Sequence, residues 1–400
     1  MASSKKKRKN KNGTADIMKS PVPVITEEKP KKNRALLIIV CIFLSALFCF
    51  GAVLVTVNLV RNARYVASYD GYGMDEGVLA YFASAYKMSY VSNLPPAEAQ
   101  RADTDADFWN SIPEGGTLTY AEDLKRGFEN YVREILVANA LYRSGGADYS
   151  EQVERALSYV TADAAFGGST DAFNMAVAEY GFDYDDLTEA AELYYRYLNA
   201  ARSIYGEVGE YVPVAGCSEY LKTYSHVKMV FVNSERLANN VNGCADDIAA
   251  LRSAMSAGLV SEEQIDYLIT EKKHNSIDIP RGVKGEYYFG VNADFTVEIG
   301  NTHPDIHAVL EKALTMNEGE CVEMPYPNGV CFIYRCAPEE GVYANSDYDL
   351  YFEDFYIDAA EYLYKKEVKS LLPEVKIKES FFDVDIVSMP KNIFYRVKFD

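Results

Sequence analysis

Cysteine and histidine are the residues of this chain with the widest range of chemistry, and their spacing excludes a common type of zinc site. Five of the seven cysteines follow residue 60, and they are Cys217, Cys244, Cys321, Cys331 and Cys336. None of them forms a Cys-x2-Cys pair, and His274, His303 and His307 do not complete such a pattern. We therefore expect no metal and no other cofactor.

The same cysteines allow several disulfides. Cys321 lies within reach of Cys331 or Cys336 across a predicted hairpin, and Cys217 and Cys244 flank a predicted strand. Disulfides form in an oxidising compartment, where an odd number of cysteines leaves one thiol unpaired. The connectivity stays open at the level of sequence.

An acidic segment imitates a calcium-binding loop. Asp103, Asp105 and Asp107 alternate, and Glu114 follows eleven residues after the first of them. Calcium loops of this type need a glycine for their sharp turn, and Phe108 stands in its place. The segment is therefore expected to be a solvated acidic loop.

The N-terminal region predicts a membrane anchor. Residues 35–60 contain no charged side chain and are rich in Leu, Ile, Val and Phe. About 20 such residues are enough to cross a bilayer, and a cleaved signal peptide has a shorter apolar core. Residues 1–34, which are expected to be disordered, carry 11 Lys/Arg and 3 Asp/Glu. Because basic flanks remain cytoplasmic, residues 61–400 are expected outside the cell membrane as the larger part of a single-pass protein.

The part after the anchor is strongly acidic. The chain has a net charge of −19, and the +8 of residues 1–34 leaves −27 for the remainder. Such a charge repels the phosphate backbone, so nucleic acid is excluded as a partner.

Residues 65–221 are expected to form an all-helical lobe. Thr119 and Glu122 form a capping box that opens one of its helices. Its predicted helices cover residues 74–92, 119–144, 150–161, 171–180 and 185–205, with a polar loop at 93–116.

Residues 222–340 mix strand and helix signals in the order β-α-α-β-α-β-β, so the fold class is α+β. The expected elements are strand 227–232, helices 245–257 and 261–272, strand 285–290, helix 303–315, and strands 320–324 and 330–335. Within residues 341–400, we expect a helix at 346–372 and an extended segment at 375–387 that pack back on the helical lobe.

Four segments of this α+β unit carry a family resemblance. They are Gly285–Gly290 (GEYYFG), Ala313-Leu314, Gly319-Glu320 and Asn328–Ile333 (NGVCFI). In this order they resemble the parvulin-type peptidyl-prolyl isomerase domain. Over about residues 65–390, the chain resembles the exported foldases of the PrsA and SurA type, whose N-terminal lobe binds peptides.

The resemblance implies where the catalytic positions fall. The two family histidines would fall on Met229 and Cys331, and the central acidic position on Asp278. In an alternative register, His226 would be the first histidine. Cys331 also fits a structural role, and Met229 an ordinary core position.

The resemblance also implies a proline pocket lined by Tyr287, Phe289 and one of Ile306 or Val309. Since Met and Cys replace two histidines, it implies a foldase that binds unfolded secreted polypeptides and proline-containing segments, with weak or lost isomerase activity. An isomerase with a different polar network around Asp278, His226 or His274, and a non-enzymatic envelope scaffold, are the alternatives.

Overall fold

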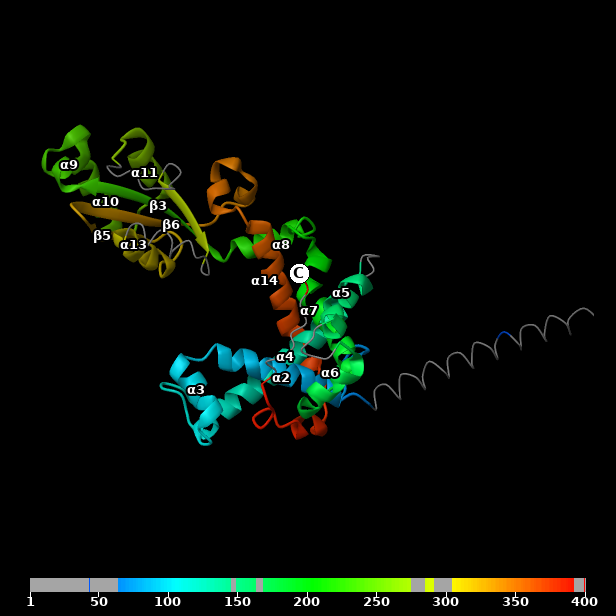
Figure 1. The fold of residues 1–400 in the computed structure, drawn as a ribbon. Helices are drawn as coiled ribbons and strands as arrows, with labels where there is room; N and C mark the ends of the chain where they lie inside the picture. Colours follow the sequence, from blue (N-terminus) through cyan, green and yellow to red (C-terminus); the bar gives the residue numbers. More distant parts are fainter. Residues whose placement is uncertain are drawn as a thin grey trace, which may run out of the picture. The chain divides into compact units, whose positions relative to one another are not determined.

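The first part of the described chain is mainly helical. The structure is a computed structural model that describes residues 43, 64–144, 149–162, 168–274, 285–290, 304–391 and 399. Its first helices are α2 (Glu76–Ser92), α3 (Pro96–Thr104), α4 (Tyr120–Leu141), α5 (Ser150–Ala162), α6 (Thr170–Val177), α7 (Tyr184–Tyr205) and α8 (Val214–Leu221) (Figure 1).

The start of α4 confirms the predicted capping box. The Thr119 hydroxyl accepts a hydrogen bond from the Glu122 N–H, and the Glu122 carboxylate accepts one from the Thr119 N–H. The apolar residues that follow at helical spacing, including Leu124, Phe128 and Val132, are buried in one core with α2 and α7. Helical periodicity therefore predicted the buried face of α4 correctly.

The helical lobe also contains a small sheet, so the expectation of an all-helical lobe was wrong. Strands β1 (Ala67–Tyr69) and β2 (Tyr72–Met74) form a hairpin, and β7 (Lys376–Ile377) pairs with β1. The two turn residues, Asp70 and Gly71, have φ of +42° and +86°. Asp-Gly is a strong signal for this hairpin turn, but strands of two or three residues are too short to show an alternating pattern.

The loop expected at 93–116 is partly helical. Pro96 opens α3, where a missing N–H costs no helical hydrogen bond. Phe108 begins a short 3-10 turn and is fully buried, stacked on Tyr120. The burial of Phe108 therefore orders a segment that was predicted to be a loop because of its polar composition.

The second part of the chain forms a four-stranded antiparallel sheet in the order β4-β3-β6-β5. Its strands are β3 (Tyr224–Asn233), β4 (Glu286–Gly290), β5 (Cys321–Tyr326) and β6 (Gly329–Cys336). Its helices are α9 (Ser234–Ala238), α10 (Cys244–Ala257), α11 (Glu262–Asp266), which continues as one π turn (Tyr267–Glu271), and α13 (Pro304–Leu314). The predicted element order is confirmed, with the short α9 as an addition.

Helices cover both faces of this sheet (Figure 1). Alternate residues of β3 and β6 pack with Val309 and Leu310 of α13 on one face. The residues between them pack with α10 and α11 on the other face. We call these the α13 face and the α11 face. Since both faces are buried, β3 reads as a nearly continuous apolar run.

The C-terminal segment differs from its prediction in two places. The helix expected at 346–372 is divided into a 3-10 turn (Ser346–Tyr351) and α14 (Phe355–Leu371), because Phe352 leaves helical geometry and is buried with its aromatic neighbours. The extended segment expected at 375–387 forms a strand only in β7, because β1 is short and has few residues with which that segment can pair. A 3-10 turn follows at Glu379–Asp383. Helix α14 contacts α4, α7 and α8.

The remaining expectation concerns the membrane anchor. Among the described residues, no helix is long and apolar enough to span a membrane. The predicted anchor at 35–60 lies outside them, apart from residue 43.

Candidate functional site

The α13 face brings together the two positions where the resemblance places histidines. Met229 on β3 is paired with Ile333 on β6, and Phe231 is paired with Cys331. Met229 and Cys331 are therefore diagonal neighbours on adjacent strands and point to the same face. Both side chains have no exposed surface.

Three of the proposed pocket residues lie in the same core. Tyr287 and Phe289 come from β4, and Val309 comes from α13. All three are buried. Asp278 lies outside the described residues, and Ile306 belongs to α13, but its side chain is not among those described. The described residues of this face thus form a closed apolar core.

The Cys331 thiol in this core is not a nucleophile. Burial raises the pKa of Cys331 well above its ordinary value, so the thiol stays protonated. Met229 supplies only a weak acceptor, and Cys331 only a weak donor. Neither provides the polar, titratable group that a histidine would provide.

His226 points to the α11 face, away from Met229 and Cys331. Its ring stacks on Tyr288 with centroids 4.2 Å apart, and its Nδ1 lies 2.9 Å from the carbonyl oxygen of Ala337. Its Nε2 is buried and has no hydrogen-bond partner within the described part of the chain. His226 and Cys331 therefore cannot share one site.

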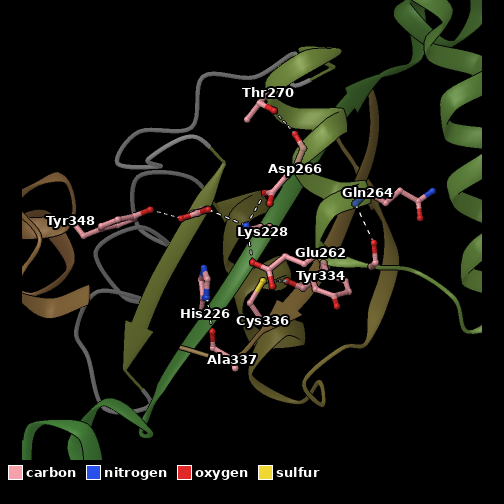
Figure 2. A network of polar contacts seen from close by, with 12 residues as sticks. His226, Lys228, Glu262, Gln264, Asp266, Thr270, Tyr334, Cys336, Ala337 and Tyr348 are labelled. Carbon is pink, nitrogen blue, oxygen red and sulfur yellow. Dashed lines mark hydrogen bonds and ion pairs between the residues drawn. The ribbon is translucent and has the colours of Figure 1, made fainter. Parts of the chain in front are cut away.

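The α11 face instead carries a buried ion network around Lys228 (Figure 2). The Lys228 ammonium lies 2.7 Å from Asp266, 2.8 Å from Glu262 and 3.2 Å from Glu286. Only 5% of the Lys228 side chain is exposed. The Tyr348 hydroxyl donates a hydrogen bond to the Glu286 carboxylate, so the network ties β3, β4, α11 and the turn before α14 together.

The electrostatics of the network follow from this geometry. Burial opposes the charge of Lys228, but hydrogen bonds to Asp266 and Glu262 outweigh it and raise the Lys228 pKa. Burial lowers the pKa of His226, and the nearby Lys228 charge lowers it further. The hydrogen bond to Ala337 and the charge of Glu286 oppose this shift without reversing it. His226 is thus neutral near pH 7.

No sequence pattern predicted this network. A single lysine inside an apolar strand was the available signal. Glu262 and Asp266 lie one turn apart on α11, but nothing in the sequence indicates that they face Lys228.

The five cysteines among the described residues are free thiols. Cys321 lies against the α11 face and Cys331 lies in the core of the α13 face, so these two cannot pair. Cys217 on α8 and Cys244 on α10 lie in different core clusters. Cys336 shares the α11 face with Cys321.

Metal binding finds no support in the described part of the chain. No group of three or more His, Cys, Asp or Glu side chains there is arranged to hold an ion. In the acidic segment, Asp103 pairs with Lys391 and Asp105 with Arg101. These carboxylates are therefore used within the protein.

Comparisons with known proteins give a distant likeness to foldases. No family model and no curated protein matches the chain. Among solved structures, PrsA from Bacillus subtilis is 14% identical with a TM-score of 0.20, over 66% of this chain and 91% of its own. The peptidylprolyl isomerase PrsA from Bacillus cereus is 15% identical with a TM-score of 0.20, over 70% and 95%. The foldase protein PrsA from Streptococcus pneumoniae is 10% identical with a TM-score of 0.18, over 70% and 98%. Likeness at this level is no evidence for fold or activity, so the function is inferred from the residues of the chain itself.

Replacing Lys228 with Met is expected to destabilise the protein. The change leaves the poorly exposed Glu286 carboxylate without its counter-charge, and losing one partner of a buried ion pair costs about 3 kcal/mol. Urea unfolding of residues 62–400, which form one compact unit, measures the free energy of unfolding. Lys228→Met combined with Glu286→Gln should recover part of the loss.

Lys365→Met is the matched control, because Lys365 makes an exposed pair with Glu361 on α14. Its loss should cost no more than about 0.5 kcal/mol. Equal losses for Lys228→Met and Lys365→Met would show that the network does not stabilise the sheet.

His226 is expected to make stability depend on pH. Because the folded-state pKa is lowered, the contribution of His226 is fully present above its unfolded pKa of about 6.5 and is lost as the pH falls below that value. The slope approaches about 1.4 kcal/mol per pH unit. Urea unfolding of residues 62–400 between about pH 7.5 and about pH 5.5, one unit on either side of ordinary His titration, measures it.

His226→Phe keeps an aromatic ring against Tyr288 and removes the titration. The variant should lose stability less steeply over the same pH range. An unchanged slope would mean that His226 is not the group that takes up the proton.

Proposed function

We propose that the chain is a membrane-anchored, extracytoplasmic foldase that binds unfolded secreted polypeptides and whose parvulin-like unit has little or no isomerase activity. One observation carries the second half of this proposal. The positions that resemble the family histidines hold Met229 and Cys331, side by side in a closed apolar core.

The chemistry of isomerisation explains why this core matters. Rotation about an X–Pro bond meets a barrier of about 18–20 kcal/mol and makes no new bond. An isomerase lowers the barrier by gripping the proline ring and stabilising the twisted amide more than the planar one. A core that offers the amide no titratable partner can hold the proline ring but cannot stabilise the twisted amide by a hydrogen bond. The loss of one positioned polar group commonly lowers the rate of an enzyme about 100-fold.

Anchoring and export are part of the same proposal. The uncharged run at 35–60 and the basic residues before it support a single span with the N-terminus in the cytoplasm. The acidic charge of the remainder supports protein clients over nucleic acid.

A purified fragment of residues 62–400 tests the function directly. We expect it to suppress the aggregation of an unfolded, proline-containing client, followed by light scattering. We expect no acceleration of cis-to-trans isomerisation of a proline peptide, followed by a protease-coupled assay. Binding without catalysis is the signature of a foldase whose site lacks its histidines.

Asp278→Ala is the control for the isomerase assay, because the resemblance places the acidic catalytic position there. A clear rate that falls with Asp278→Ala would make the chain an active isomerase. A fragment that neither slows aggregation nor speeds isomerisation would support a scaffold instead.

Restoring both histidines tests the assignment of the positions. Met229→His with Cys331→His puts two imidazoles at diagonal positions of β3 and β6. If these are the catalytic positions, the isomerisation rate should rise by about 100-fold, the effect typical of a positioned polar group. Far-ultraviolet circular dichroism must first show that the double variant is folded.

Met229→Leu with Cys331→Ala is the control for the disturbance of core packing, since it changes the same two residues without adding a polar group. A folded double-histidine variant with no gain over this control would refute the assignment of Met229 and Cys331 to the catalytic positions.

A further inference from the structure

Lys87 on α2 is a buried lysine that binds main-chain oxygens. It is only 8% exposed. Its ammonium donates a hydrogen bond of 2.6 Å to the carbonyl oxygen of Val387 and another of 2.6 Å to that of Met389. The same ammonium lies over the Trp109 ring, 5.1 Å from its centroid. Lys87 therefore holds the backbone of a polypeptide segment and not one particular side chain.

Residues 385–389, which we call the C-terminal turn, supply these carbonyls. The Met389 N–H donates a hydrogen bond of 3.0 Å to the carbonyl oxygen of Asp385, which closes one helical turn. The Asp385 carboxylate accepts hydrogen bonds from the Val387 N–H and the Ser388 hydroxyl. The carbonyls that face Lys87 thus belong to the last residues of a helical turn, where carbonyls lack helical partners and a cation is favourable.

One aliphatic side chain fixes the turn to the helical lobe. Ile386 is 2% exposed and belongs to the same core as α2 and α4, and Val387 and Met389 pack against that core. Just after the turn, Lys391 makes an ion pair of 2.7 Å with Asp103. The lobe therefore offers this segment apolar packing for one side chain and a cation for its main-chain oxygens.

Main-chain pairing does not attach the turn to the lobe within the described part of the chain. The main-chain hydrogen bonds described for residues 384–391 run within that segment itself. A few residues earlier, in contrast, the Lys378 N–H still donates to the carbonyl oxygen of Val66. Segments that are held by few buried contacts open at a low cost in free energy. The turn can therefore leave the lobe while the described strand pairing of β7 stays intact.

We propose that Lys87 and the core around Ile386 form a polypeptide-binding site, which the C-terminal turn occupies until a client segment replaces it. The ligand is a short apolar segment that places an aliphatic side chain where Ile386 lies and directs main-chain carbonyls to Lys87. Main-chain carbonyls occur in every polypeptide, so the site suits clients of many sequences. This inference rests on the proposed polypeptide-binding function and assigns it a site with an internal competitor.

The chemistry of the site decides the class of ligand. A hydrocarbon chain would fill the place of Ile386 but leave the buried Lys87 ammonium without an acceptor, which is costly. A small anion would satisfy the ammonium but not the apolar core. A polypeptide segment supplies an aliphatic side chain and carbonyl oxygens at neighbouring positions, as the C-terminal turn does.

A labelled peptide copied from residues 383–391 (DVDIVSMPK) is the probe. Fluorescence anisotropy measures its binding to the full-length chain in a neutral detergent. Ile386→Ser in the protein removes the side chain that fixes the turn, so it should empty the site and leave Lys87 in place. Since apparent affinity scales with the fraction of open sites, we expect the probe to bind Ile386→Ser about ten-fold more tightly than the unaltered chain.

Phe382→Ser is the matched control, because Phe382 is an exposed apolar residue shortly before the turn. The probe should bind this variant and the unaltered chain equally. In the Ile386→Ser background, Lys87→Met should weaken binding of the probe about ten-fold, as expected for lost hydrogen bonds to a charged group. Lys365→Met, which removes an exposed lysine of α14, should not weaken it.

Hydrogen–deuterium exchange tests the same inference on the unaltered chain, and so does not depend on the folding of a variant. The Val387 and Met389 amides are hydrogen-bonded within the turn. Addition of a reduced and alkylated, permanently unfolded client protein should speed their exchange, because the turn leaves its site. The amides at the centre of α4 should exchange at an unchanged rate.

Each of three results would contradict the inference. If the probe binds Ile386→Ser no more tightly than Phe382→Ser, or if the client leaves exchange in the turn unchanged, the turn is a fixed part of the lobe. If the client does not displace the probe from Ile386→Ser, the site serves the turn alone. If Lys87→Met leaves the affinity unchanged, the probe binds elsewhere.

Light scattering with the unaltered chain separates these failures from a failure of the proposed function. A chain that suppresses aggregation but gives any of the three results is a foldase that binds its clients at another site. A chain that does not suppress aggregation refutes the proposed function, and the assignment of this site to clients is refuted with it.

Discussion

The ion network of Lys228 is the interaction on which the sheet region depends. β3 is a central strand, with β4 on one side and β6 on the other. Its one lysine would carry a severe desolvation cost in this buried position unless carboxylates compensated the charge. Glu262 and Asp266 bring α11 to the strand, and Glu286 fixes β4. A single buried charge thus determines where two neighbouring elements must lie.

This arrangement divides polar and apolar chemistry between the two faces of the sheet. Successive residues of a strand point to opposite faces, so His226 and Lys228 lie on the α11 face and Met229 on the α13 face. The polar groups that a site requires are therefore present in this unit, but they stabilise the fold. The α13 face, which carries Met229 and Cys331, is apolar.

The helical lobe is completed by segments that are distant in sequence. β7 pairs with β1 more than 300 residues earlier, and the Lys87 ammonium donates hydrogen bonds to the carbonyls of Val387 and Met389. Helix α14 also returns to the lobe, where it packs against α4, α7 and α8. The lobe is therefore complete only because the chain returns to it after the sheet is made.

The sequence alone determined the order of the strands and longer helices of residues 222–340, the α4 capping box and the buried face of α4, because these follow from local hydrogen bonding and from the 3.6- and 2-residue periods. That Met229 and Cys331 lie near each other was expected only from the resemblance, and the pairing of β3 with β6 places them on one face. Only the tertiary structure decided the short β1–β2–β7 sheet, the break at Phe352 and the partners of Lys228. The physical reason is that burial and charge compensation depend on which distant segments meet, and no local pattern records those contacts.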